Sequence, residues 1–353
     1  MSTYHEELKN KETLRLREIQ KELPPFTQSF FRGIAQTTST KTRLAYAYDL
    51  RIFFRYLYEE HRSLGGVDAK DLTAERLNEV TSEDIDCFLE YLTYYIRPDQ
   101  ENPAYGKEMH NDEKGKSRKL AAVRMLFKFY YKKKIIAADP ASLVDTPKIH
   151  EKAIVRLDVN ETADFLDAVE TGEKLTDRQK AFHEKTKKRD LAMMTLLLGT
   201  GMRVSECVGI NIKDLDFKNN AVKVTRKGGN ETFLYYGDEV REALEDYLEE
   251  RQNANVREED ADALFLSGQG RRISVRMVQN MVKKYANGIT LKKITPHKLR
   301  STFGTNLYQE TGDIYLVADV LGHADVNTTR KHYADIEDGR RRMAATHIKL
   351  RKD

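Results

Sequence analysis

Hydrophobic and polar positions in the first half of the chain follow a helical period. After the cluster "TTST", Leu44, Tyr48 and Ile52 recur at helical spacing, and Ser or Thr side chains in such a cluster can cap a helix. The segment "TSEDIDCFLEYLTYYI" repeats this arrangement from its first two residues onward. The pattern predicts that residues 26–145 are all-helical.

Three segments in this half depart from that pattern or add charge to it. Residues 1–25 are predicted to form a polar helical arm that ends at Pro24–Pro25, because proline interrupts a helix. Residues 97–116 are polar and hold two prolines and two glycines, which is typical of a loop. The helix predicted next, over residues 116–134, is strongly basic.

The pattern changes after a linker predicted at residues 146–154. A capping-box motif indicates a helix start at Asn160, and a later apolar helix ends in a Gly-Thr-Gly turn. The stretch "AVKVTRKGGNETFLYYG" alternates, turns at Gly228–Gly229 and alternates again, which predicts a β-hairpin. The fold class is therefore mainly α with a small antiparallel β-sheet. The remaining helices are interrupted at Pro296, Gly312 and Gly322.

Length and charge add a domain count and a candidate partner. A chain of 353 residues favours two domains, since single cores stop growing near roughly 250–300 residues. The net charge is only +4, but residues 114–134 hold nine basic side chains and no acidic one. Such a patch suits a phosphate backbone, although a solvated helix face remains the alternative. The candidate DNA-binding residues are Lys116, Arg118, Lys119, Arg124 and Lys128.

Several classes of protein are disfavoured. The two cysteines, Cys87 and Cys207, are far apart and lack metal-ligand spacing, so neither a disulfide framework nor a zinc site is expected. The N-terminus is charged from the start, and no apolar run approaches the roughly 18 residues of a membrane span. We expect no membrane association and a cytoplasmic location.

Six polar residues of the second half lie beside predicted turns. Taken singly, each is an ordinary surface or packing residue. Together they suit the attack of a side chain on a phosphodiester, because guanidinium groups stabilise the charge that develops on the phosphate. A tyrosine can be the nucleophile, a lysine can protonate the leaving oxygen, and no metal or other cofactor is needed. The candidates are Arg203, Lys227, His297, Arg300, His323 and Tyr333.

The motifs that carry these residues resemble those of the tyrosine recombinase family, the phage-integrase and Xer-like group. "TGMRVSE" resembles its first arginine motif, with Glu206 at the supporting acidic position, and "TRKGGNE" resembles its lysine hairpin. "HKLR", "LGH" and "TTRKHY" follow in the family's order. The resemblance is strong over residues 155–342 and weaker over residues 27–145.

The resemblance implies a role for each residue. Arg203 and Arg300 would clamp the scissile phosphate, and Lys227 would be the general acid toward the 5′ oxygen. His297 would be the general base for Tyr333, the nucleophile. His323 would hydrogen-bond the phosphate. His332 and Tyr315 are neighbours that could be mistaken for catalytic residues.

The resemblance also implies the architecture and assembly. A helical, SAM-like core-binding domain over residues 26–145 and a catalytic domain over residues 155–353 would form a C-shaped clamp on DNA. The reaction would pass through a 3′-phosphotyrosyl intermediate and a Holliday junction. The partners would be double-stranded DNA with inverted-repeat core sites and three further copies of the chain. Residues 340–353 would dock on a neighbouring protomer, and in a bacterial cell the enzyme would be associated with the nucleoid.

Alternatives remain open at this point. One is a type IB topoisomerase-like enzyme that relaxes DNA, and another is a catalytically silent DNA-binding factor with the same fold. Within the recombinases, a chromosome-dimer resolvase, a mobile-element integrase and an invertase are all compatible with the motifs. The target sequence, the accessory proteins and the side chains that contact bases are not predicted.

Overall fold

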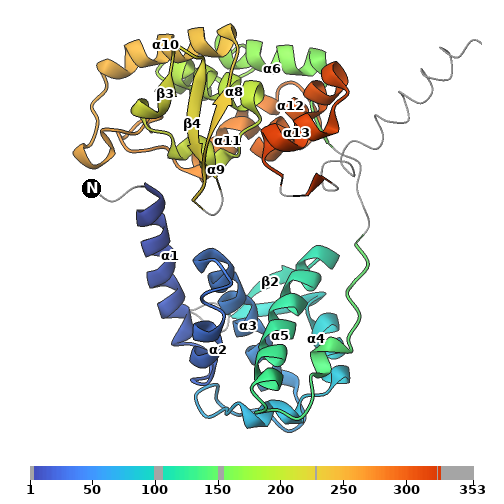
Figure 1. Cartoon of the computed structure of the whole chain (residues 1–353). Helices are drawn as coiled ribbons and strands as arrows, with labels where there is room; N and C mark the ends of the chain where they lie inside the picture. The colour runs from blue at the N-terminus through green and yellow to red at the C-terminus, as the bar shows by residue number, and fades with distance from the viewer. Residues whose placement is uncertain (1–3, 99–105, 150–154, 227–228, 324, 327–353) are drawn as a thin grey trace, which may run out of the picture. The chain divides into compact units, whose positions relative to one another are not determined.

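The computed structural model describes residues 4–98, 106–149, 155–226, 229–323 and 325–326. The chain divides into two compact units, residues 1–151 and 152–353, and the division falls inside the segment predicted as a linker. Figure 1 shows the helices and strands of each unit. The described part is mainly helical with two small antiparallel sheets, as the sequence pattern predicts.

The first unit consists of helices and one two-stranded hairpin. In chain order its elements are α1 (Tyr4–Gln20), α2 (Thr27–Gly33), α3 (Thr40–Glu60), α4 (Ser82–Tyr91), β1 (Tyr94–Pro98), β2 (Gly106–His110) and α5 (Glu113–Lys132), with short 3-10 turns at Glu75–Glu79 and Pro140–Ser142. The predicted caps are present. The Ser39 side chain caps α3, and Thr81 forms a capping box with Asp84 at the start of α4.

The core of the first unit is aromatic and includes α1. Phe53 packs edge-on against Phe88 and Phe127, with ring centroids 5.1 and 6.3 Å apart. Leu16 and Ile19 of α1 are buried in the same core. The segment expected as a polar arm therefore buries one face against the unit, because Leu16 and Ile19 are three positions apart and lie on the same side of the helix.

The β1–β2 hairpin corrects the prediction that residues 97–116 form a loop and that the first half is all-helical. The two strands pair antiparallel, from Tyr94 opposite His110 to Pro98 opposite Gly106. Tyr94, Tyr95 and Ile96 continue the apolar spacing of α4, yet aromatic and β-branched residues pack well in a strand once a partner strand is present. The basic helix begins and ends earlier than the predicted range of residues 116–134, since α5 runs from Glu113 to Lys132.

The second unit surrounds a buried helix. Its elements are α6 (Val159–Thr171), α7 (Asp177–His183), α8 (Lys187–Thr200), α9 (Val204–Gly209), β3 (Leu215–Asp216), β4 (Ala221–Thr225), β5 (Glu231–Tyr235), α10 (Asp238–Gln252), α11 (Val275–Ala286), α12 (Pro296–Thr311) and α13 (Ile314–Leu321), with 3-10 turns at Ile212–Asp214 and Glu258–Asp260. Helices α6, α10 and α12 pack on α8, which is apolar on nearly all sides (Figure 1).

The predicted β-hairpin is present as β4 and β5, with β3 added at the edge of the sheet. Ala221 lies opposite Tyr235, and Thr225 lies opposite Glu231. The helix predicted to begin at Asn160 instead begins with Asp158 as N-cap, whose carboxylate forms the capping box with Glu161. Asp158 supplies the same chemistry two residues earlier, so the motif was placed in the wrong register.

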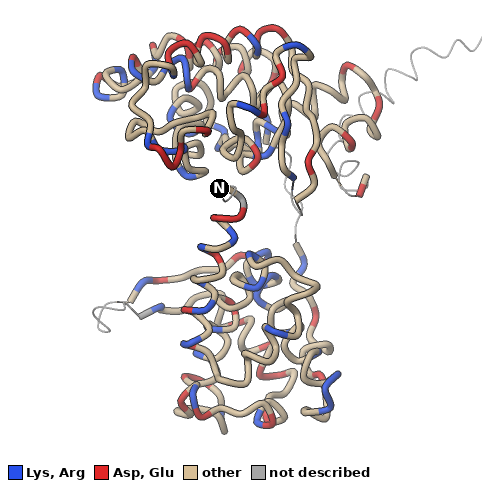
Figure 2. The backbone as a smooth tube through the Cα atoms, turned by 60° about the vertical axis from the view of Figure 1, so that its left-hand side comes forward, with Lys and Arg blue, Asp and Glu red and all other residues tan. Residues whose placement is uncertain are grey.

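Acidic residues of the second unit gather on α10. Figure 2 shows acidic positions along the top of this unit, where α10 and α6 lie in Figure 1, and the sequence of α10 is rich in Asp and Glu. The Thr225 and Glu231 end of the β4–β5 hairpin is the end of the strands opposite to the one that α10 follows. Because phosphate repels carboxylates, α10 is a poor surface for DNA.

Candidate active site

The candidate residues gather around the C-terminal end of α13. Gly322 ends this helix with a left-handed φ of 61°, and its N–H donates to the carbonyl of Asp319 at 2.8 Å. The N–H of His323 donates to the carbonyl of Ala318 at 2.9 Å, which completes a Schellman motif. The last carbonyls of a helix receive no hydrogen bond from an N–H of the same helix. The carbonyls from residue 320 onward therefore need donors from elsewhere.

Three arginines from three other elements supply these donors. The carbonyls of residues 320, 321 and 322 each accept a hydrogen bond from a different guanidinium. The donors are, in that order, Arg226 at 2.9 Å, Arg300, and Arg203 at 3.3 Å. The C-terminal end of a helix carries about half a negative charge, which favours cations there. We call these three residues the arginine cluster.

Arg203 is held from a second side by Glu206. Arg203 is the N-cap of α9, and its Nη1 donates to Oε1 of Glu206 at 2.8 Å. The other carboxylate oxygen accepts the backbone N–H of Arg203 at 2.9 Å. Glu206 is only 5% exposed, whereas the Arg203 side chain is 36% exposed. These bonds and the one to residue 322 use two of the five guanidinium N–H groups, so a solvent-facing donor edge remains.

Arg300 lies deeper and ties two turns together. It is 5% exposed on α12, and its Nη1 donates to the carbonyl of Gly201 at 2.7 Å, while Nη2 donates to Leu321. Gly201 ends α8 with φ 62°, and a Cβ there would lie 2.3 Å from the Phe303 ring. The Gly-Thr-Gly turn thus allows the close approach that puts Arg203 and Arg300 on one helix end.

The two predicted histidines are placed differently. His297 lies on the first turn of α12, after Thr295 as N-cap and Pro296 at the first helical position, and its side chain is exposed. It precedes Arg300 by three residues, so both lie on one face of the helix. His323 is half-buried and follows the αL residue Gly322 directly. The structure therefore brings Arg203, Arg300 and the His323 backbone to one turn.

Two of the six predicted catalytic residues, Lys227 and Tyr333, lie outside the described residues, as do the neighbouring His332 and the C-terminal segment 340–353. Sequence reasoning did not single out Arg226. The available signal was its position, as a second basic residue directly before the predicted tip lysine.

The five predicted DNA-binding residues of α5 have unequal surroundings. Lys119 is 5% exposed and its Nζ donates to Oδ1 of Asn111 at 2.6 Å. Arg124 donates to the Ala141 carbonyl at 3.1 Å and to Oγ1 of Thr146 at 2.7 Å. Both cations support the fold of the first unit in this structure.

The other three α5 residues keep more of their surface. The Arg118 side chain is 53% exposed while it pairs with the buried carboxylate of Asp49. Lys116 donates to Oγ1 of Thr93 at 2.7 Å, beside the β1–β2 hairpin, and Lys128 is exposed. These three are the better placed of the five to meet a phosphate.

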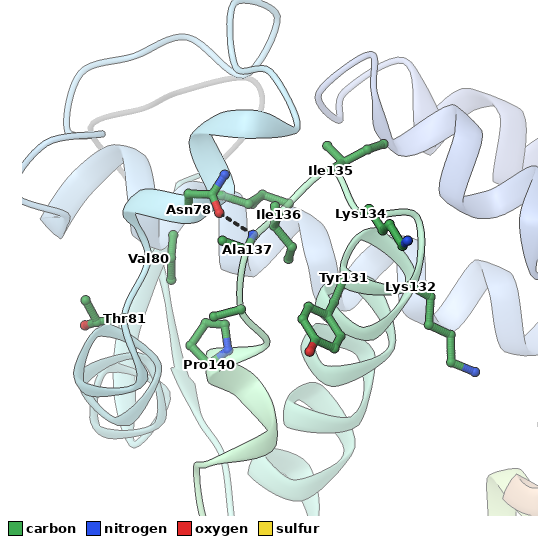
Figure 3. A pocket seen from close by; sticks show the side chains of 12 residues that line it. Asn78, Val80, Thr81, Tyr131, Lys132, Lys134, Ile135, Ile136, Ala137 and Pro140 are labelled. Carbon is green, nitrogen blue, oxygen red and sulfur yellow. Dashed lines mark hydrogen bonds between the residues drawn. The ribbon is translucent and has the colours of Figure 1, made fainter.

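A hollow of about 1030 Å³ lies in the first unit, near the C-terminal end of α5. Its walls include Val80, Tyr131 and Ile136, and Oδ1 of Asn78 accepts the backbone N–H of Ala137 there at 2.8 Å (Figure 3). The described residues that line this hollow include no carboxylate and no histidine.

Within the described residues, no group of three or more His, Cys, Asp or Glu side chains is placed to hold a metal ion. None of the helices in the described ranges is long and apolar enough to cross a membrane.

Comparisons with known proteins agree with the geometry of the second unit. Residues 156–340 match the model of the phage integrase family. The chain is 30% identical over 342 residues to a tyrosine recombinase XerC of Caldanaerobacter subterraneus subsp. tengcongensis, covering 94% of this chain and 88% of that relative.

Solved structures share the fold. The XerH site-specific recombinase, in a post-cleavage complex with a palindromic difH substrate, aligns with TM-score 0.63 at 21% identity, over 89% of this chain and 81% of that one. A lambda integrase tetramer bound to a Holliday junction aligns with TM-score 0.59 at 16% identity, over 87% of this chain and 76% of that one.

Proposed function

The chain belongs to the phage integrase family, and we propose that Arg203 and Arg300 of its arginine cluster bind the phosphate of the DNA strand that it cuts. The protein is a site-specific tyrosine recombinase, an enzyme that breaks and rejoins DNA strands. The observation that carries the assignment of the site is the placement of Arg203, Arg226 and Arg300 on three successive carbonyls at the end of α13.

The two arginines of the family motifs bind the scissile phosphate. Attack on a phosphodiester builds negative charge on its non-bridging oxygens, and fixed guanidinium donors stabilise that charge without reorganising. Glu206 and the α13 carbonyls fix Arg203 before DNA binds, and the Gly201 and Leu321 carbonyls fix Arg300. His323, which directly follows Gly322 at this helix end, hydrogen-bonds the same phosphate.

Tyr333 is the nucleophile. Its Oη attacks phosphorus, the bond from phosphorus to the 5′ oxygen breaks, and a 3′-phosphotyrosyl link and a free 5′-hydroxyl result. His297 accepts the phenolic proton, and Lys227 donates a proton to the 5′ oxygen. The 5′-hydroxyl of the partner duplex then attacks the link and releases Tyr333. One phosphoester replaces another at each step, so the exchange needs no energy source.

Both units bind the same duplex. In the first unit Lys116, Arg118 and Lys128 contact the phosphate backbone, where each contact releases counterions and makes binding depend on salt. Four copies act on two inverted-repeat core sites and pass through a Holliday junction, with residues 340–353 docking on a neighbouring copy. The XerH complex with a palindromic substrate and the lambda integrase tetramer on a Holliday junction support this assembly. In a bacterial cell the enzyme acts on DNA of the nucleoid.

The topoisomerase-like alternative gains no support, since the family and the relatives reported above are recombinases and integrases. A catalytically silent DNA-binding factor would lack the covalent step, which makes that step the decisive measurement.

The test uses a nicked duplex that traps the covalent intermediate. Fragments that flank the gene and the replication terminus of its host are screened as sites, without metal or nucleotide. We expect an SDS-resistant protein–DNA adduct with the wild type and none with Tyr333→Phe. An adduct that persists in Tyr333→Phe assigns another nucleophile. DNA binding without an adduct on any fragment supports the silent factor.

A further inference from the structure

The Arg226 side chain connects the β4–β5 hairpin to α13. It follows the last residue of β4, and it is half-buried. Its Nη2 donates to the Val320 carbonyl at 2.9 Å, and its Nη1 reaches the Asp319 carbonyl at 3.4 Å. These acceptors lie more than ninety positions further along the chain, so the contact joins two elements that local structure does not hold together.

Backbone hydrogen bonds also join Arg226 to residues on the other side of the hairpin turn. The N–H of Arg226 donates to the Asn230 carbonyl at 2.8 Å, and the Arg226 carbonyl accepts the N–H of Gly229 at 3.0 Å. These bonds join Arg226, the residue from which the turn begins, to Gly229 and Asn230 on the other side of the turn. A side chain that fixes Arg226 to α13 therefore fixes the start of the turn as well.

The fit of Arg226 depends on Gly322. A Cβ at residue 322 would lie 2.1 Å from Nη1 and 2.5 Å from Cζ of Arg226, so the guanidinium occupies the space that the missing side chain leaves. In the described part of the chain, the Nε of Arg226 is buried without a hydrogen-bond partner. A buried unpaired donor costs about 1–3 kcal/mol, which offsets part of what the two hydrogen bonds of this arginine contribute.

We propose that Arg226 is a positioning residue that holds Lys227 at the leaving-group side of the arginine cluster. Lys227 is the next residue, with its Cα about 3.8 Å from that of Arg226. Through Arg226, the start of the turn is tied to the helix end that also receives Arg203 and Arg300. Arg226 itself touches neither DNA nor the reacting atoms. This inference rests on the proposed role of Lys227 as general acid.

A change of leaving group tests it. With an ordinary duplex, the 5′ oxygen leaves as an alkoxide unless a proton reaches it as the bond to phosphorus breaks. With sulfur in place of this bridging oxygen, a thiolate leaves unaided, because a thiol has a pKa of about 8.5 whereas an alcohol is far less acidic. Adduct formation is measured for the wild type and Arg226→Ala on both versions of the duplex that reacts in the screen.

We expect Arg226→Ala to slow adduct formation on the oxygen duplex by about 10- to 100-fold, a part of the roughly 10²–10⁴ that a positioned acid contributes. On the sulfur duplex its rate should return to within a few-fold of the wild type. The ratio of the two rates is the diagnostic, since a fraction of unfolded enzyme lowers both equally. Arg226→Lys, which keeps the charge but not the two-carbonyl fork, should show a smaller loss with the same rescue.

Two controls separate the inference from its premise. Arg241→Ala, on the same unit, removes an exposed arginine paired with Glu245 and should leave both rates unchanged. Lys227→Ala should be rescued by sulfur if Lys227 is the acid. If Lys227→Ala is rescued and Arg226→Ala is equally slow on both duplexes, or is not slowed at all, the positioning role is wrong. If neither variant is rescued, the proposed role of Lys227 fails first.

Discussion

Replacing Gly322 by alanine tests the packing at the end of α13. The new Cβ would sit at φ 61°, where an L-residue is disfavoured by about 1–2 kcal/mol, and 2.1 Å from Nη1 of Arg226. The guanidinium must therefore leave, and a hydrogen bond from a charged group is worth about 1.5–3 kcal/mol. The two contributions predict a loss of about 2.5–5 kcal/mol in the free energy of unfolding.

A matched glycine and a double variant separate the two contributions. Gly229 has φ 90° with nothing within 4 Å of its Cβ position, so Gly229→Ala carries the backbone contribution alone, about 1–2 kcal/mol. In an Arg226→Ala background, Gly322→Ala should fall to the same value. Urea unfolding followed by circular dichroism gives all four free energies. An equal loss for Gly322→Ala in both backgrounds would refute the steric argument.

Three further predictions concern other parts of the molecule. Glu206→Gln removes the negative charge that holds Arg203 and should slow adduct formation about 10- to 100-fold. The affinity for the duplex should stay within a few-fold of the wild type. An unchanged rate would mean that Arg203 is positioned without the charge of Glu206. Ile19→Ala should lower the free energy of unfolding by about 2–5 kcal/mol if α1 belongs to the core. Leu14→Ala, at an exposed position of the same helix, should lower it by less than about 0.5 kcal/mol. Equal values would mean that α1 is a polar arm outside the core. Burial raises the pKa of Asp49 to about 6 although Arg118 lowers it, so the folded state favours the protonated carboxyl, and stability should fall by up to about 3 kcal/mol as the pH rises from 4 to 6. Asp49→Asn should remove that part of the pH dependence in urea unfolding at pH 4 to 7, and an unaltered pH profile would contradict the assignment.

Features set by neighbouring residues were predictable from the sequence. The caps at Ser39 and Thr81 depend on side chains within three positions of the helix end, and the structure confirms them. The β4–β5 hairpin was marked by its own turn residues in the same way.

Features set by distant partners were not predictable. Tyr94–Ile96 fits a helix by spacing and becomes a strand only because residues 108–110 pair with it. Lys119 and Arg124 look like DNA contacts in a basic run, yet their acceptors lie in other segments, on Asn111 and beyond residue 140. For the same reason the motifs placed Arg203 and Arg300 in one site without showing that the end of α13 is what assembles them.

The arginine cluster also has a consequence for the order in which the protein is made. Arg203 and Arg226 bind carbonyls that lie 119 and 94 positions later in the chain. A ribosome synthesises a chain from its N-terminus, so a growing polypeptide carries these two arginines long before their acceptors exist. The closing of such long loops delays their contacts further. A nascent chain cannot assemble the cluster until residue 322 has emerged, so no translation product that ends before this residue contains the complete arginine cluster.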